Sequence, residues 1–87
     1  MHATLVKVTI SDAESATEAL RSQVVPRIKE LPGFQAGYWT RAGNSGVSLV
    51  VFDSEEAAQA AAEQVRSVVP QGVSVDDVEV REVVAHA

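Results

Sequence analysis

The sequence predicts an α+β fold in which a four-stranded antiparallel sheet carries two helices on one face. Four segments are rich in β-branched or aromatic residues, and two segments between them repeat apolar residues at steps of three and four. Their order is strand, helix, strand, strand, helix, strand, and Pro32-Gly33 marks the first return from helix to strand. This is the ferredoxin-like order, and right-handed crossovers place both helices on the same side of the sheet.

The first strand is predicted over 3–10 and the first helix over 13–31. Ser11 and Glu14 have the spacing of a capping box, in which the serine hydroxyl caps the helix start. Pro26 has no N–H to donate, so we expect it to kink the helix or split it near Val25, and we favour a simple bend over a functional hinge. The helix is expected to bury one stripe, made of Ala13, Ala16, Leu20, Val24, Ile28 and Leu31.

The central hairpin follows the Pro-Gly pair. The second strand is predicted from Phe34 to about Arg41, a turn over 42–46 (Ala-Gly-Asn-Ser-Gly), and the third strand over 47–52. The third strand is apolar on both sides, with Val47, Leu49 and Val51 on one and Val50 and Phe52 on the other. Both of its faces therefore need to be covered.

The second helix is predicted to begin after residues 53–56 (Asp-Ser-Glu-Glu), which supply a cap and first-turn acids. Residues 70–72 (Pro-Gln-Gly) are expected to end it, and its buried line is Ala61, Val65 and Val68. In the last segment, 73–84, the valines change parity around Asp76-Asp77. This predicts a bulge or a break at that point and two strand pieces.

The sheet face opposite the helices is expected to be covered by a second copy of the chain. The third strand is apolar on that face, and 87 residues supply no third layer. Symmetric dimers are the commonest soluble oligomers. We therefore expect a single domain over 1–87 that forms a homodimer through the sheet face.

The amino-acid composition disfavours several classes of binding partner and of chemistry. Seven Lys and Arg are scattered among twelve Asp and Glu, for a net charge of −5, which disfavours nucleic acid. Cysteine is absent, which excludes disulfides and thiolate chemistry. The N-terminal residues lack the layout of a signal peptide, and no apolar run reaches the length of a membrane span. We expect a soluble, cytoplasmic protein with neither a nucleic-acid nor a membrane partner.

Two stretches carry a family resemblance: Leu31-Pro32-Gly33-Phe34 with Gly37-Tyr38, and residues 51–57 (Val-Phe-Asp-Ser-Glu-Glu-Ala). With these stretches in the expected order along nearly its whole length, the sequence resembles members of the dimeric α/β-barrel superfamily. Within that superfamily it is most similar to the small proteins grouped with antibiotic-biosynthesis monooxygenases. The resemblance implies two sheets that close into a barrel across a two-fold axis, with a pocket in each subunit. It also implies polycyclic aromatic quinols as substrates, oxidised without metal or flavin, although other members degrade haem or have no known activity.

The resemblance does not assign catalytic residues here. Monooxygenases of that group use an asparagine on the first strand and a tryptophan at the end of the third strand; this first strand has no asparagine, and Phe52 stands at the tryptophan position. Asn44 falls in the hairpin, where a turn-forming role is favoured. His2 and His86 lie at the chain ends, and we favour solvated termini over metal ligands. Neither a metal nor a cofactor is predicted.

Four residues are candidates for holding a substrate or ligand: Tyr38, Trp39, Arg41 and Phe52. Tyr38 and Trp39 point to opposite faces of one strand, so at most one of them faces a given cavity, and core or dimer contact is favoured for each. Arg41 follows on the Trp39 face and can hold an anionic group, although a rim or ion-pair role is favoured.

Three functions stay open at this point. The first is a cofactor-independent monooxygenase acting on an aromatic or polycyclic substrate. The second is a non-catalytic binder of a small hydrophobic ligand in the same cavity, and the third is a structural dimer with no catalytic site. A cavity beside Trp39 and Phe52 would separate the third from the first two.

Overall fold

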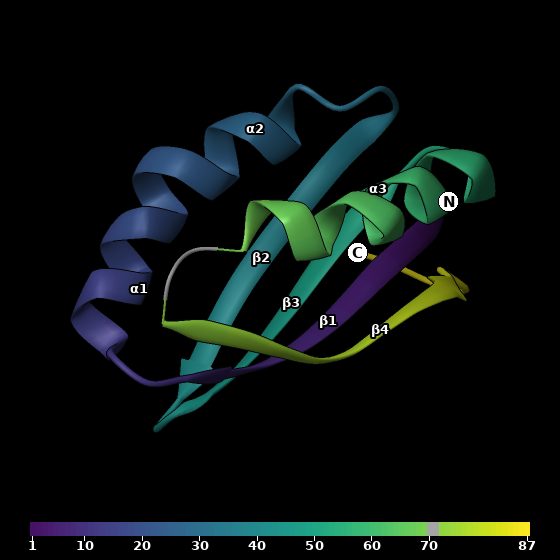
Figure 1. Cartoon of the computed structure of the whole chain (residues 1–87). Helices are drawn as coiled ribbons and strands as arrows, with labels where there is room; N and C mark the ends of the chain where they lie inside the picture. The colour runs from purple at the N-terminus through teal and green to yellow at the C-terminus, as the bar shows by residue number, and fades with distance from the viewer. Residues whose placement is uncertain (70–71) are drawn as a thin grey trace.

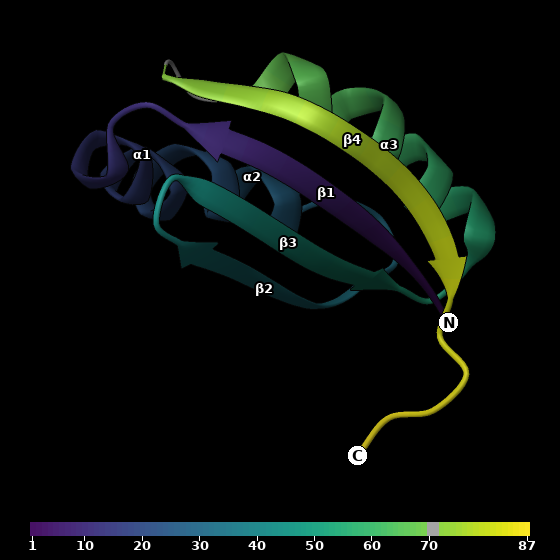
Figure 2. The same cartoon turned by 90° about the horizontal axis from the view of Figure 1, so that it is seen from below.

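The sheet and its helices form two layers (Figure 1). The computed structural model describes residues 1–69 and 72–87, with only the backbone of Val68. In chain order the elements are β1 (His2–Ile10), α1 (Ala13–Ala19), η1 (Leu20–Val24), α2 (Val25–Lys29), β2 (Phe34–Ala42), β3 (Ser45–Phe52), α3 (Glu55–Val68) and β4 (Val73–Glu82). The strands form one antiparallel sheet in the order β2-β3-β1-β4 (Figure 2). The α+β prediction is confirmed, and this order is compatible with the ferredoxin-like arrangement.

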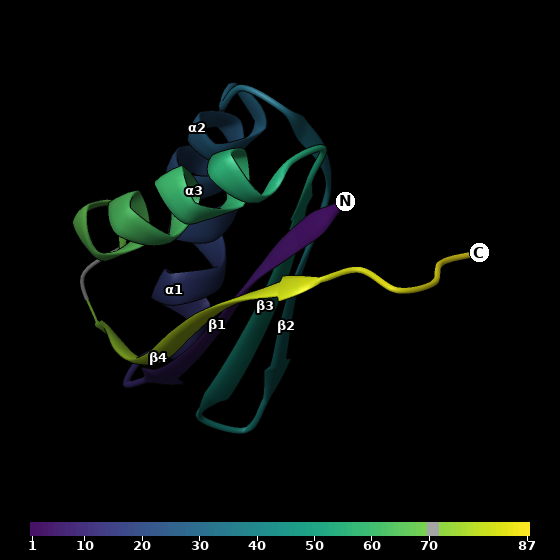
Figure 3. The ribbon, with the colours of Figure 1, turned by 90° about the vertical axis from the view of Figure 1, so that its right-hand side faces the viewer.

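The helices lie on one side of the sheet, which leaves the other face open (Figure 3). The N–H of Val83 donates to the carbonyl of Met1 at 2.9 Å, just after β4 ends. The C-terminal tail then leaves on the open side of the sheet (Figure 3). Of the helices in the described ranges, none is long and apolar enough to cross a membrane.

Asp12, and not Ser11, caps the first helix, so the predicted serine cap is wrong. The Asp12 carboxylate accepts from the N–H of Ser15 at 3.2 Å. The Ser11 hydroxyl instead donates to the carbonyl of Gly72 at 2.9 Å. Aspartate and serine cap helices about equally well, so the cap passes to the residue that is not engaged elsewhere.

The first helix is interrupted where Pro26 predicts. Residues Leu20–Val24 form a π-helical turn, in which the N–H of Val25 donates to the carbonyl of Leu20. Pro26 follows directly in the first turn of α2, and its missing N–H removes one donor from the helical ladder. The helical path is continuous from Ala13 to Lys29, so the expected irregularity near Val25 is present as a π turn and not as a split.

The sheet has a tight hairpin and two register shifts, one where β4 pairs with β1 and one at the start of β2. Gly43-Asn44 joins β2 to β3, and Gly43 takes a φ of 62°, which favours glycine. In β4, Asp77 pairs with Lys7 and Val75 with Val8, which leaves Asp76 as the extra residue. The bulge is confirmed. The expected two strand pieces are wrong, because β1 pairs with β4 on both sides of Asp76.

The second helix begins as predicted and lies close to the sheet. The Ser54 hydroxyl accepts from the N–H of Ala57 at 3.2 Å and caps α3. Ala58 and Ala61 are buried, because alanine lets a helix approach a sheet closely. The helix ends at Val68, just before the stop predicted at 70–72. The side chain of Val68, predicted to be buried, and residues 70 and 71 of the predicted stop lie outside the part of the chain that the structure describes.

The core lies between the helices and the sheet. Phe52 is fully buried, and its ring meets that of Phe34 edge to face with centroids 6.3 Å apart. Thr4 is a buried polar residue whose hydroxyl donates to the carbonyl of Ala58 at 2.8 Å, which ties α3 to β1. The main buried cluster consists of Val24, Ile28, Val50, Phe52, Ala58 and Ala61.

Candidate functional site

A crevice runs between the helices and the sheet, and Trp39 lines it along its length. Its inner part consists of two small cavities of about 50 Å³ and 30 Å³. The residues that line both are Val6, Val24, Trp39, Ser48 and Val65. They come from the sheet, from the π turn and from α3, so the crevice is a seam between layers. Its lining is suited to apolar groups.

The crevice continues into a larger outer cavity of about 270 Å³. Ile10, Leu20, Trp39 and Thr40 line both the outer cavity and the inner one. The outer cavity is completed by Thr17, Arg21, Val25 and Arg41. The space is therefore apolar inside, and two arginines line its wider end.

Gly37 sets the position of the Trp39 ring. A Cβ at residue 37 would lie 2.8 Å from both Cη2 and Cζ3 of the indole. The ring therefore lies over the bare backbone of Gly37, two residues back on the same face of β2. Because residue 37 has no side chain, the indole ring has space to lie where it lines the crevice.

The structure brings two of the four predicted site residues together and separates the other two from them. Trp39 and Arg41 both line the outer cavity. Tyr38 points to the open face and is 64% exposed. Phe52 is fully buried in the core, edge-on to Phe34.

Sequence reasoning missed the helical side of the outer cavity. Thr17, Arg21 and Val25 line it, and they succeed one another at steps of four along the helix. Residues four apart lie on one helix face. That spacing is the signal that could have found them, since the three residues form a row beside the buried stripe.

The residues weighed as metal ligands or as a catalytic amide lie apart from the crevice. His2 Nε2 is 3.4 Å from Glu55 Oε2, and His86 is exposed in the tail. Asn44 is in the hairpin turn, where its carbonyl accepts from the N–H of Ile10 at 2.7 Å. Among the residues that the structure describes, no three His, Cys, Asp or Glu side chains gather as a metal site would require.

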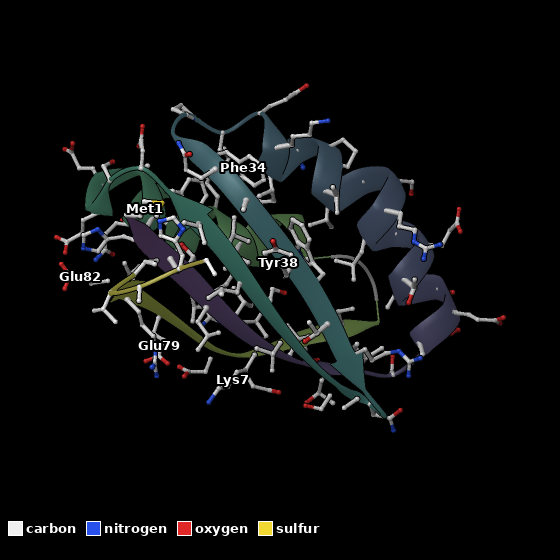
Figure 4. All side chains as sticks on the ribbon, turned by 180° about the vertical axis from the view of Figure 1, so that it is seen from behind. Met1, Lys7, Phe34, Tyr38, Glu79 and Glu82 are labelled. Atoms are coloured by element: carbon white, nitrogen blue, oxygen red, sulfur yellow. The ribbon has the colours of Figure 1, made fainter. Side chains whose placement is uncertain are left out.

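The open face of the sheet is a second candidate surface. One row across it places Tyr38, Leu49, Leu5 and Glu79 side by side. Leu49 is 39% exposed and its neighbour Val47 38%. Figure 4 views this face, with Tyr38 over β2 and Lys7 and Glu79 toward the β4 margin. The face is thus apolar over β2 and β3 and becomes charged toward β4.

No model of a known protein family matches the sequence, and no curated protein matches it. The resemblance to the dimeric α/β-barrel superfamily therefore stays a prediction that rests on residues 31–38 and 51–57.

Proposed function

We propose that the protein binds a small hydrophobic molecule in the crevice beside Trp39. The observation that carries this is a seam lined by aliphatic side chains, which widens into a cavity of about 270 Å³. That volume is near the lower end of ligand sites, roughly 300 Å³. Burial against such a lining favours an apolar ligand, and Trp39 offers an aromatic surface.

Ligand binding can be tested by the fluorescence of the single tryptophan. Trp39 is the only tryptophan in the chain, so its fluorescence reports on the crevice. Titration with 1-octanol is expected to change the emission of Trp39 and to raise the midpoint of thermal unfolding with concentration, because a ligand that binds only the folded state stabilises it.

A matched pair of variants locates the binding. Ser48 lines both inner cavities, whereas Ser45 lies on the same strand and faces the open side, opposite Ala42. Ser48→Leu fills the crevice and is expected to abolish both responses to 1-octanol, while Ser45→Leu keeps them. Equal responses in the two variants would place the ligand elsewhere and refute the proposal.

The protein is further proposed to act as a homodimer joined through the open sheet face. Tyr38, Val47 and Leu49 are exposed there, and a large apolar patch on a soluble protein marks an interaction site. A second copy supplies a matching face by symmetry. The tail leaves on this same side, with Val84 86% exposed, and would meet the partner (Figure 3).

A cofactor-independent monooxygenase is the second candidate function. It is favoured by the apolar lining around Trp39, which suits a polycyclic aromatic substrate. An anthrone would be its own reductant: its methylene group and O₂ give a carbonyl group and water. Incubation with anthrone in air is expected to yield the quinone faster with the native chain than with Ser48→Leu. Equal rates would count against the enzyme and leave the binder standing.

A further inference from the structure

We propose that the ligand of the crevice is an apolar monocarboxylic acid whose carboxylate lies between Arg21 and Arg41. This rests on the function proposed above and deepens it by assigning the ligand class. The crevice would take the hydrocarbon part, and the outer cavity the head group.

The two arginines reach the outer cavity from opposite layers. Arg21 belongs to the π turn η1, and Arg41 follows Trp39 on the helix-facing side of β2. Both line the same cavity of about 270 Å³ together with apolar Ile10 and Val25. A ligand with its apolar end beside Trp39 would therefore place its other end near two cations.

Both guanidinium groups are available to an anion. Arg41 Nη1 donates to the carbonyl of Gly43 at 2.9 Å, which fixes the side chain and uses one of its five N–H groups. The ion pairs found within 1–69 and 72–87 are His2–Glu55 and Arg81–Glu79. Neither Arg21 nor Arg41 takes part in them. A carboxylate accepts bidentate hydrogen bonds from arginine, which is the geometry that such a head group requires.

The charge of the whole chain favours a monoanion. The net charge is −5, so the long-range field opposes anions and opposes a dianion more strongly than a monoanion. Arg21 and Arg41 at the outer cavity offset this repulsion of anions locally. A carboxylate fits that balance better than a doubly charged phosphate monoester.

The test compares four probes of one chain length: octanoate, 1-octanol, octyl phosphate and octyltrimethylammonium. Each is titrated into the full chain while Trp39 emission is followed at low ionic strength. Octanoate is expected to bind most tightly of the four. Added salt is expected to lower the affinity for octanoate and to leave the affinity for 1-octanol unchanged, because exposed charges are screened.

Arg41→Gln and Arg21→Gln remove the charge and keep a polar side chain, which is shorter than that of arginine. Each is expected to weaken octanoate about threefold to tenfold, as loss of an exposed charge-assisted hydrogen bond does, and to leave 1-octanol unchanged. The control is Arg66→Gln, because Arg66 is exposed in the last turn of α3. This substitution should alter neither the affinity for octanoate nor the affinity for 1-octanol.

The outcomes separate the two proposals. Equal affinities for octanoate and 1-octanol would overturn the carboxylate assignment and leave the apolar binding site intact. Tighter binding of octyl phosphate would also overturn it, in favour of a dianion. No Trp39 response to any probe would overturn both proposals.

Discussion

At the scale of single residues, Gly37 and Trp39 act as a unit. The indole occupies the space that a side chain at residue 37 would need, with ring atoms 2.8 Å from the position of a Cβ. A contact this short forces one of the two to move. The crevice thus depends on a residue that contributes no side chain to it.

Gly37→Ala is therefore expected to displace the Trp39 ring and to lower the free energy of unfolding by about 1–3 kcal/mol, the usual cost of overpacking. Near-UV circular dichroism reports the ring, and urea unfolding reports the stability. In a Trp39→Leu background the smaller side chain leaves room, so the same change should cost much less. An equal cost in both backgrounds would show that the two residues are not coupled.

At the scale of elements, the π turn of Leu20–Val24 has two physical causes. Pro26 removes one N–H from the helical ladder. The buried stripe is the second cause: it advances from Ala16 to Ile28 by steps of four, and each such step drifts about 40° round an ideal α-helix. A π turn holds more residues per turn, so it returns Val24 and Ile28 to the sheet, where both are buried.

If burial of the stripe is the dominant cause, Pro26→Ala keeps the π turn. We expect the free energy of unfolding to change by less than about 1 kcal/mol, since Pro26 is exposed at the start of α2. Amide chemical shifts of residues 20–25 should stay close to those of the native chain, and Trp39 emission should be unaltered. A regular α-helix in the variant would make proline the cause.

The sequence was informative where structure depends on neighbouring residues. The hairpin, the helix irregularity near Val25 and the bulge near Asp76 follow from local residue types and parity, and all are present. The cap of the first helix did not follow, because Gly72 engages Ser11 from 61 residues away. Arg21 was also missed, since it becomes part of a site only when β2 brings Arg41 beneath the helix.

At the scale of the whole molecule, the layers leave one sheet face without cover. The row Tyr38, Leu49, Leu5 crosses that face, and only toward β4 do charged residues replace apolar ones. Burying a leucine or a valine contributes roughly 1.5–3 kcal/mol, so a few such residues decide whether two copies associate.

Leu49→Lys places a charge at the centre of that row and is expected to prevent the proposed association of two copies without unfolding the chain. Sedimentation equilibrium at micromolar concentration measures this. Gln59→Lys, on the exposed side of α3, adds the same charge and should leave the proposed association unchanged. A native chain that sediments as a monomer would refute the association.

The Asp76 bulge bears on how copies of this chain can meet. β4 is an edge strand, and its extra residue, held by a bond from the Thr9 hydroxyl to the Asp76 carboxylate at 2.7 Å, interrupts the regular row of backbone donors and acceptors. Such an interruption makes it harder for a strand of another molecule to pair with this sheet edge. Open-ended growth into filaments is thereby disfavoured along that border.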